Sequence, residues 1–161
     1  MKKSFCSVVM LASLFCGAAT SKPNPSGDLK IKVVRASRSG KITLQIENSS
    51  NEPIRLWRGW NSWGWGIWRV LRLRKGRLET FFQKPDKDFL RNLAEFYEIA
   101  AGAHTTEILN INSGQWYGLR SKTVNLLPGD MITVVYDVPA TDTAIAQAVW
   151  NGVAATFMTV H

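Results

Sequence analysis

Residues 41–54, KITLQIENSSNEPI, decide the fold class of this chain. Ile42, Leu44 and Ile46 alternate with polar residues, and a period of two is typical of a strand that buries one of its faces. A cluster of turn-forming residues follows at 48–53, after which the chain resumes in extended form. The stretch therefore predicts two strands joined by a polar turn.

The same signals recur along the rest of the chain. Strands are predicted at residues 29–33, 68–74, 107–111, 131–138 and 153–160, with turn-forming residues between many of them. Short strands at intervals of about 8 to 15 residues favour an antiparallel sandwich or barrel. We therefore expect a mainly β protein.

Two stretches favour a helix instead. Residues 88–94 carry apolar side chains at helical spacing, and we expect a short helix there, followed by a strand at 95–99. Residues 140–149 are a second helical candidate, with Thr141 or Asp142 as the N-terminal cap. The expected β fold thus has room for one short helix or helical insertion.

Two stretches carry a resemblance to a known family. Residues 43–54 resemble the early hairpin of bacterial extracytoplasmic immunoglobulin-like domains, in which a strand ending in Asn-Ser precedes a Pro-led strand. Residues 127–136, LPGDMITVVY, are similar to the late Pro-Gly-led strand of the same domains. The resemblance implies an antiparallel immunoglobulin-like sandwich, which we expect to form a single domain over residues 29–161. It implies no activity, because such sandwiches serve many unrelated functions.

The N-terminal residues 1–21 have the pattern of a cleaved signal peptide. Two lysines precede an uncharged apolar run at 5–16, and small residues follow it. The run is shorter than the roughly 20 residues that a spanning helix needs, so we expect no stable membrane insertion. Cys16 follows Phe15, where a lipidation motif needs a small residue, so a lipoprotein is disfavoured. We expect a secreted or periplasmic protein with a flexible lead-in at 22–28.

Cysteine content and charge narrow the classes of function. Cys6 and Cys16 both lie in the predicted leader, so the mature chain would have no cysteine and no thiol chemistry. The net charge of the 161-residue chain is +8, and removing the leader leaves 18 basic and 12 acidic residues, or +6. A basic protein outside the cytoplasm is expected to meet glycans, cell-wall polymers or lipid headgroups rather than nucleic acid.

Segment 55–77 has the most unusual composition. It contains five of the seven tryptophans and seven basic residues, but no acidic residue. The tryptophans are Trp57, Trp60, Trp63, Trp65 and Trp68, and the basic residues are Arg55, Arg58, Arg69, Arg72, Arg74, Lys75 and Arg77. Such a segment is a candidate for ligand binding.

The residue types in this segment point to carbohydrate. In a strand, Trp63, Trp65 and Ile67 would share one face, while intervening glycines would leave the other face bare. Indole rings stack on sugar rings, and arginines pair with carboxylate, sulfate or phosphate. The pattern predicts a surface for a glycan, including an anionic one. The candidate residues are Trp60, Trp63 and Trp65 for stacking and Arg58 and Arg69 for charge pairing.

A second interpretation of segment 55–77 involves no ligand. The tryptophans would fill the core, and arginines alternating with Leu71 and Leu73 would form an ordinary solvated strand face. The protein would then be a protein-interaction or protease-inhibitor-like envelope domain that acts through loops or a strand edge. The sequence does not decide between these interpretations, and it does not give the oligomeric state.

Catalysis has little support in the sequence. The two histidines, His104 and His161, come without a cysteine ligand or a nucleophile-elbow motif, so we expect no metal site, no cofactor and no enzymatic activity. A small hydrolase that pairs two carboxylates is a residual alternative. Its candidate carboxylates are Glu79, Glu95, Glu98 and Glu107.

Overall fold

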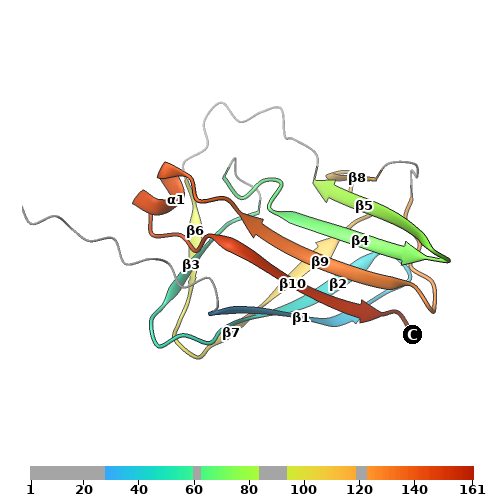
Figure 1. The fold of residues 1–161 in the computed structure, drawn as a ribbon, viewed down its shortest axis with the longest axis horizontal. Coiled ribbons are helices and arrows are strands. Elements are labelled where there is room, and N and C mark those ends of the chain that lie inside the picture. The colour runs from blue at the N-terminus through green and yellow to red at the C-terminus, as the bar shows by residue number, and fades with distance from the viewer. Residues whose placement is uncertain (1–27, 60–62, 84–93, 119–122) are drawn as a thin grey trace, which may run out of the picture.

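The computed structural model describes residues 28–59, 63–83, 94–118 and 123–161. Strands hold 55% of the described residues and helix holds 4%, which confirms the prediction of a mainly β protein. Neighbouring strands pair antiparallel throughout these residues, and the sheets do not close into a barrel (Figure 1).

Five strands form two small sheets. One has the order β1-β2-β7, and the other pairs β3 with β6. The strands are β1 Leu29–Ala36, β2 Lys41–Asn48, β7 His104–Asn110, β3 Ile54–Trp57 and β6 Phe96–Ile99. The alternation that predicted a strand at 41–47 is confirmed, because Ile42, Leu44 and Ile46 are all buried. The strand predicted at 95–99 is confirmed as β6, whereas the helix predicted before it at 88–94 lies outside the described residues.

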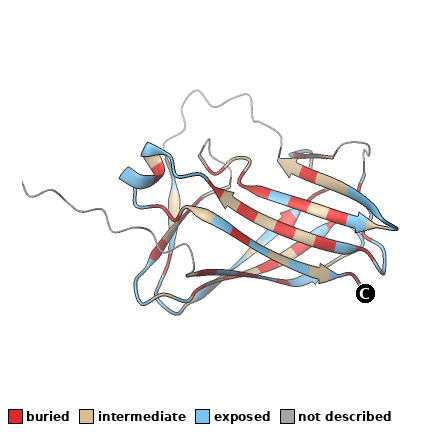
Figure 2. Cartoon of the chain, in the orientation of Figure 1, coloured by how far each residue is buried: buried red, intermediate tan, exposed pale blue. Residues whose placement is uncertain are grey.

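The other five strands form a larger sheet of order β10-β9-β4-β5-β8. They are β10 Gly152–Thr159, β9 Met131–Val138, β4 Trp68–Arg74, β5 Arg77–Gln83 and β8 Trp116–Gly118. Figure 1 shows this sheet in front of β1, β2 and β7. Buried side chains from all three sheets belong to one hydrophobic cluster, so the sheets share a core (Figure 2).

The second predicted helix is confirmed in shortened form as α1, Asp142–Ala146. The Thr141 hydroxyl accepts a hydrogen bond from the Ala144 N–H at 3.2 Å, which is the predicted cap. Two residues after the helix, Ala148 has a φ of 51°, which turns the chain toward β10. None of the helical segments in the described part of the chain is long and apolar enough to cross a membrane.

Some tryptophans of segment 55–77 lie in the core, which the interpretation without a ligand predicted for all of them. Trp57 at the end of β3 and Trp68 at the start of β4 are buried, together with Trp116 and Trp150. The ring of Tyr136 lies between two of them, with centroids 4.4 Å from Trp68 and 5.7 Å from Trp150. Aromatic rings at such distances contribute packing beyond the area that they bury.

A buried asparagine connects β2 to β6. The Nδ2 group of Asn48 donates to the carbonyl oxygens of Glu52 at 2.8 Å, Ile99 at 2.9 Å and Ala100 at 3.1 Å. Its Oδ1 accepts from the main-chain N–H of Ser50 at 2.9 Å and from the Ser50 hydroxyl at 2.7 Å. One side chain therefore holds the predicted turn at 48–53 and fixes it to the neighbouring sheet.

Candidate functional site

Residues 63–66 form a turn, so Trp63 and Trp65 do not have the strand arrangement in which they would share one face with Ile67. The two glycines explain the difference. Gly66 has a φ of 75°, a conformation that side chains disfavour, and a Cβ on Gly64 would overlap the carbonyl oxygen of Arg58. The glycines therefore allow a tight turn against the end of β3 instead of leaving one face of a strand bare.

This turn forms one wall of an open cavity of about 640 Å³, which we call the tryptophan pocket. Its lining residues are Trp57, Trp63, Trp65, Gly66, Ile67, Arg69, Phe82, Gln83, Asp137, Pro139 and Thr141. They come from the end of β3, the turn, β4, the end of β5 and the end of β9. The larger sheet and the turn thus bring together residues that are far apart in the sequence.

The tryptophans of the pocket differ in how they are held. Trp57 is buried, and the ring of Trp63 lies against it at 6.2 Å between centroids and 31° between planes. Trp63 is half-buried and packs against the core. Trp65 is half-buried in the turn and is not one of the residues that pack against the core cluster. Trp65 therefore contributes less to the hydrophobic core than Trp57 and Trp63 do.

Polar groups lie beside the indoles. Arg69 on β4 forms an ion pair with Asp137 on β9. The Oε1 atom of Gln83 accepts a hydrogen bond from the Gly66 N–H at 3.4 Å, which ties the turn to β5. The pocket therefore combines a wall of indoles with a guanidinium and a carboxylate at hydrogen-bonding distance from each other.

Three of the five predicted binding residues, Trp63, Trp65 and Arg69, line this pocket. Arg58 lines a different cavity, and Trp60 lies outside the described residues. Sequence reasoning missed Asp137, which is distant from the segment, and Gln83, which lies shortly after it, because both have an ordinary strand context. Trp57 belonged to the segment, but its role in the pocket became visible only with the fold.

Each of five arginines in segment 55–77 pairs with a carboxylate from elsewhere in the chain. The pairs are Arg55–Glu98, Arg58–Glu95, Arg69–Asp137, Arg72–Glu79 and Arg74–Asp130. The Arg55 pair is 2.7 Å long and well aligned, whereas the Arg58 pair is looser at 3.9 Å. The segment itself has no acidic residue, but these five arginines are nevertheless paired. They therefore do not form a surface of unpaired positive charge.

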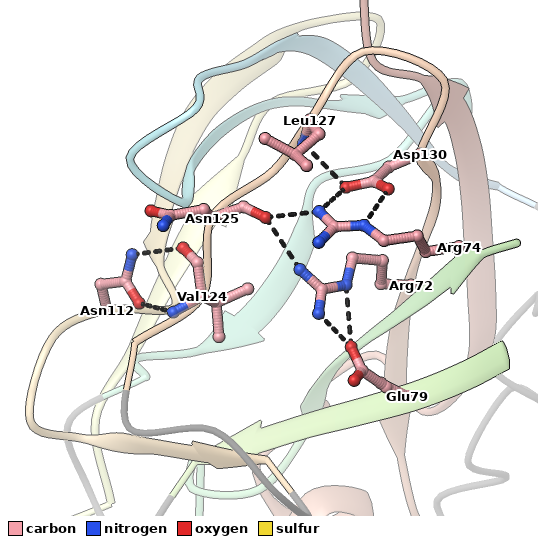
Figure 3. Close-up of polar contacts among 8 residues, drawn as sticks. All are labelled: Arg72, Arg74, Glu79, Asn112, Val124, Asn125, Leu127 and Asp130. Atoms are coloured by element: carbon pink, nitrogen blue, oxygen red, sulfur yellow. Dashed lines mark hydrogen bonds and ion pairs between the residues drawn. The ribbon is translucent and has the colours of Figure 1, made fainter.

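Arg72 is buried, so the interpretation of these arginines as a solvated strand face is wrong for this position. Its Nε donates to Glu79 at 2.9 Å, and its Nη1 donates to the carbonyl oxygen of Asn125 at 2.8 Å (Figure 3). Val70 on β4 is buried on the same face, while Leu71 and Leu73 point outward. Partner groups from β5 and from the loop before β9 make an inward arginine tolerable.

Arg74, which follows Arg72 on the inward side of β4, completes this polar cluster. It donates to both carboxylate oxygens of Asp130, at 2.6 and 2.5 Å, and to the Asn125 carbonyl at 2.6 Å. The Leu127 N–H donates to the same carboxylate at 2.8 Å (Figure 3). The guanidinium of Arg74 holds the pKa of Asp130 below its usual range, despite the opposing effect of burial. This cluster is a structural clamp on residues 125–130, since Arg72 and Arg74 bond the Asn125 carbonyl and Arg74 bonds the Asp130 side chain.

A second cavity, of about 530 Å³, contains Arg58 together with Glu107 and Tyr97. Burial raises the pKa of Glu107 and that of Tyr97 above their usual values. The other carboxylates considered for a hydrolase, at positions 79, 95 and 98, pair with arginines. The described residues contain no group of three or more metal-ligating side chains that could hold a metal ion.

The opposite pKa shifts of Asp130 and Glu107 predict a stability maximum in mild acid. The depressed pKa of Asp130 stabilises the fold at any pH above the pKa that this group has in the unfolded chain. This contribution is lost as the pH falls through the pKa of the folded state. The raised pKa of Glu107 acts oppositely, so protonating this group stabilises the fold. Urea unfolding between about pH 7 and about pH 2 would show both effects. Glu107→Gln should remove the initial rise and leave the later fall; a curve unchanged by this substitution contradicts the assignment.

Comparisons with protein-family models, with curated proteins and with solved structures gave no match. The function therefore has to be inferred from the chemistry of the chain's own residues. Of the two cavities described above, the tryptophan pocket is the one that combines indole rings with a guanidinium and a carboxylate, a mixture of apolar and polar groups that is typical of ligand pockets.

Proposed function

We propose that this protein is a non-catalytic module that binds a glycan in the tryptophan pocket. The observation that carries the proposal is the position of Trp65 and Trp63 next to the Arg69–Asp137 pair. The face of an indole stacks against the C–H face of a sugar ring, and charged groups form hydrogen bonds with the hydroxyls at the edge of that ring. A cavity of about 640 Å³ has room for a small number of sugar rings.

The ligand that fits this pocket best is an uncharged glycan. Arg69 already has the Asp137 carboxylate as its partner, so an anionic ligand would have to displace that carboxylate or lie beside it. Sugar hydroxyls both donate and accept hydrogen bonds, so they can bond the guanidinium and the carboxylate together. This pairing favours neutral sugars over the anionic ones that the basic composition alone predicted.

The proposal includes a compartment and a fold type. A signal peptide at 1–21 would deliver the protein to the periplasm or the outside, where glycans are accessible. The larger sheet and the two small sheets share one core, and this arrangement supports an immunoglobulin-like sandwich as the finer description of the fold. In such a fold the pocket lies at one end of the larger sheet, where loops carry binding residues without a change in the core.

Replacing Trp65 by alanine tests the proposed function directly. The ligands are soluble cello- and chito-oligosaccharides and insoluble peptidoglycan, at about 50 and about 500 mM salt. We expect binding at both salt concentrations and at least a tenfold loss in the variant, which corresponds to about 1.4 kcal/mol. The melting temperature should change little, because Trp65 lies outside the core cluster.

Charge-matched controls separate the pocket from general basicity. Arg69→Ala should weaken binding, while Arg77→Ala, at the exposed first position of β5, should not. Trp63→Ala should reduce both binding and stability, because Trp63 also packs on the core. Binding that disappears at high salt, or equal effects of Arg69→Ala and Arg77→Ala, would contradict the proposal. No retention of any of these ligands would also overturn it.

A further inference from the structure

The two outer faces of the β layers have opposite character. The outward positions of β1, β2 and β7 are mainly polar or charged, with Lys32, Gln45 and Thr106 in one row across the sheet. Lys41 and Asn110 form another row on this face. This face shows what the chain places on a sheet surface that contacts water.

The outward face of β10, β9, β4 and β5 is mainly apolar. Phe157 is 73% exposed, Val153 63% and Leu78 60%. Leu78, Leu73 and Met131 form a continuous row, because Leu73 pairs with Leu78 on one side and Met131 on the other. Five of the nine large exposed hydrophobic residues among those described lie on this one face. Such a patch on a solvent-exposed sheet marks an interaction surface.

We infer that a second copy of this chain covers this apolar face, sheet against sheet. The inference does not rest on the proposed glycan function, and the two compete at one end of the face, because Arg69 and Asp137 also line the tryptophan pocket. On the outward positions of these four strands the charged residues are Arg69 and Asp137, which neutralise each other. The chain as a whole carries a net charge of +8, so most of its surface repels a second copy. A face that is neutral and mainly apolar can pack against a copy of itself without charge repulsion, as a two-fold interface requires.

The area of the face fits a reversible dimer. Four strands spaced about 4.8 Å apart and about seven residues long at 3.4 Å each span about 19 by 24 Å, or about 450 Å² in flat projection. Nonspecific contacts bury less than about 400 Å² per partner, while standard interfaces bury about 800 Å². The face lies between these limits, so we expect a dissociation constant in the micromolar range.

Sedimentation velocity between about 1 and about 200 μM tests the dimer. Phe157→Lys on β10 and Leu78→Lys on β5 place a charge near opposite edges of the face, and each should raise the dissociation constant at least tenfold. The matched control is Ile108→Lys: Ile108 is 54% exposed on the outer face of β7, which is also an edge strand. The control should leave the dissociation constant within about twofold of the original. Circular dichroism should be the same for all three variants, because each replaces an exposed side chain.

Three outcomes would overturn the inference. A protein that stays monomeric up to about 200 μM has no such dimer, whether or not it binds another protein or a lipid vesicle. A dimer that survives both substitutions uses a different surface. A dimer weakened by Phe157→Lys but not by Leu78→Lys pairs through the edge of β10, which contradicts packing of sheet against sheet.

Discussion

Replacing Asp130 by asparagine is expected to lower the free energy of unfolding by about 2–4 kcal/mol, somewhat less than the cost of breaking a fully buried ion pair. The Asp130 side chain is 2% exposed and accepts three hydrogen bonds, two from Arg74 and one from the Leu127 N–H. Asparagine keeps the shape but removes the charge, and its amide group cannot accept at both positions. Arg74 is then left half-buried without its counter-charge, although partial exposure lets water compensate in part.

Urea unfolding of two matched variants tests the origin of this effect. Asp137→Asn removes the partner of Arg69, but those side chains are 32% and 46% exposed, so the loss should be at most about 1 kcal/mol. Asn125→Ala should change the unfolding free energy by less than about 0.5 kcal/mol. Both arginines use the main-chain carbonyl of Asn125, which the substitution retains. A loss in Asp130→Asn no larger than that in Asp137→Asn would contradict the buried clamp.

The β elements were predictable where one residue type repeated on every second position. In β2 the apolar residues all face the core, so periodicity alone gave the strand and its buried face. In α1 the capping residue Thr141 was visible in the sequence, because its side chain bonds within three residues. These signals are local, and local signals can be read without knowledge of the fold.

The orientation of β4 could not be predicted in this way. Its arginines alternate with leucines, and the usual preference places leucine inside. The structure has the reverse, because Arg72 finds Glu79 on β5 and a carbonyl at position 125, while the leucines belong to the apolar outer face. Partners that are contributed by other strands leave no periodic signal in the strand that needs them.

The candidate site was predictable in part for the same reason. Composition identified Trp63, Trp65 and Arg69, since unusual residue types stand out in a short segment. It could not place Asp137, which comes from β9 and reaches the pocket only because β9 pairs with β4. It also grouped Arg58 with the others, although that side chain lies in the second cavity. Proximity along the chain is a weak guide to which residues share a pocket.

Replacing Asn48 by alanine is expected to lower the free energy of unfolding by about 3–5 kcal/mol, since five hydrogen bonds of one buried side chain are lost at roughly 1 kcal/mol each. The side chain is fully buried, and it serves three carbonyl oxygens and two donor groups of Ser50. Alanine removes all five of these hydrogen bonds at the junction between β2 and β6. The Glu52 carbonyl keeps the Ser50 hydroxyl as a donor, and the Ala100 carbonyl keeps the Ala103 N–H. Hydrogen exchange should therefore accelerate in both strands, more than at the distant end of the larger sheet.

Two further variants at this turn separate hydrogen bonding from turn propensity. Asn51→Ala replaces an exposed asparagine of the same turn and should change the unfolding free energy by less than about 0.5 kcal/mol. Asn48→Asp retains the acceptor for Ser50 but sets a carboxylate against three carbonyl oxygens, so it should destabilise at least as much as alanine. If Asn48→Asp were milder than Asn48→Ala, the bonds to Ser50 would dominate. The link to β6 would then contribute little, because that link is made by the Nδ2 group of Asn48, which aspartate lacks.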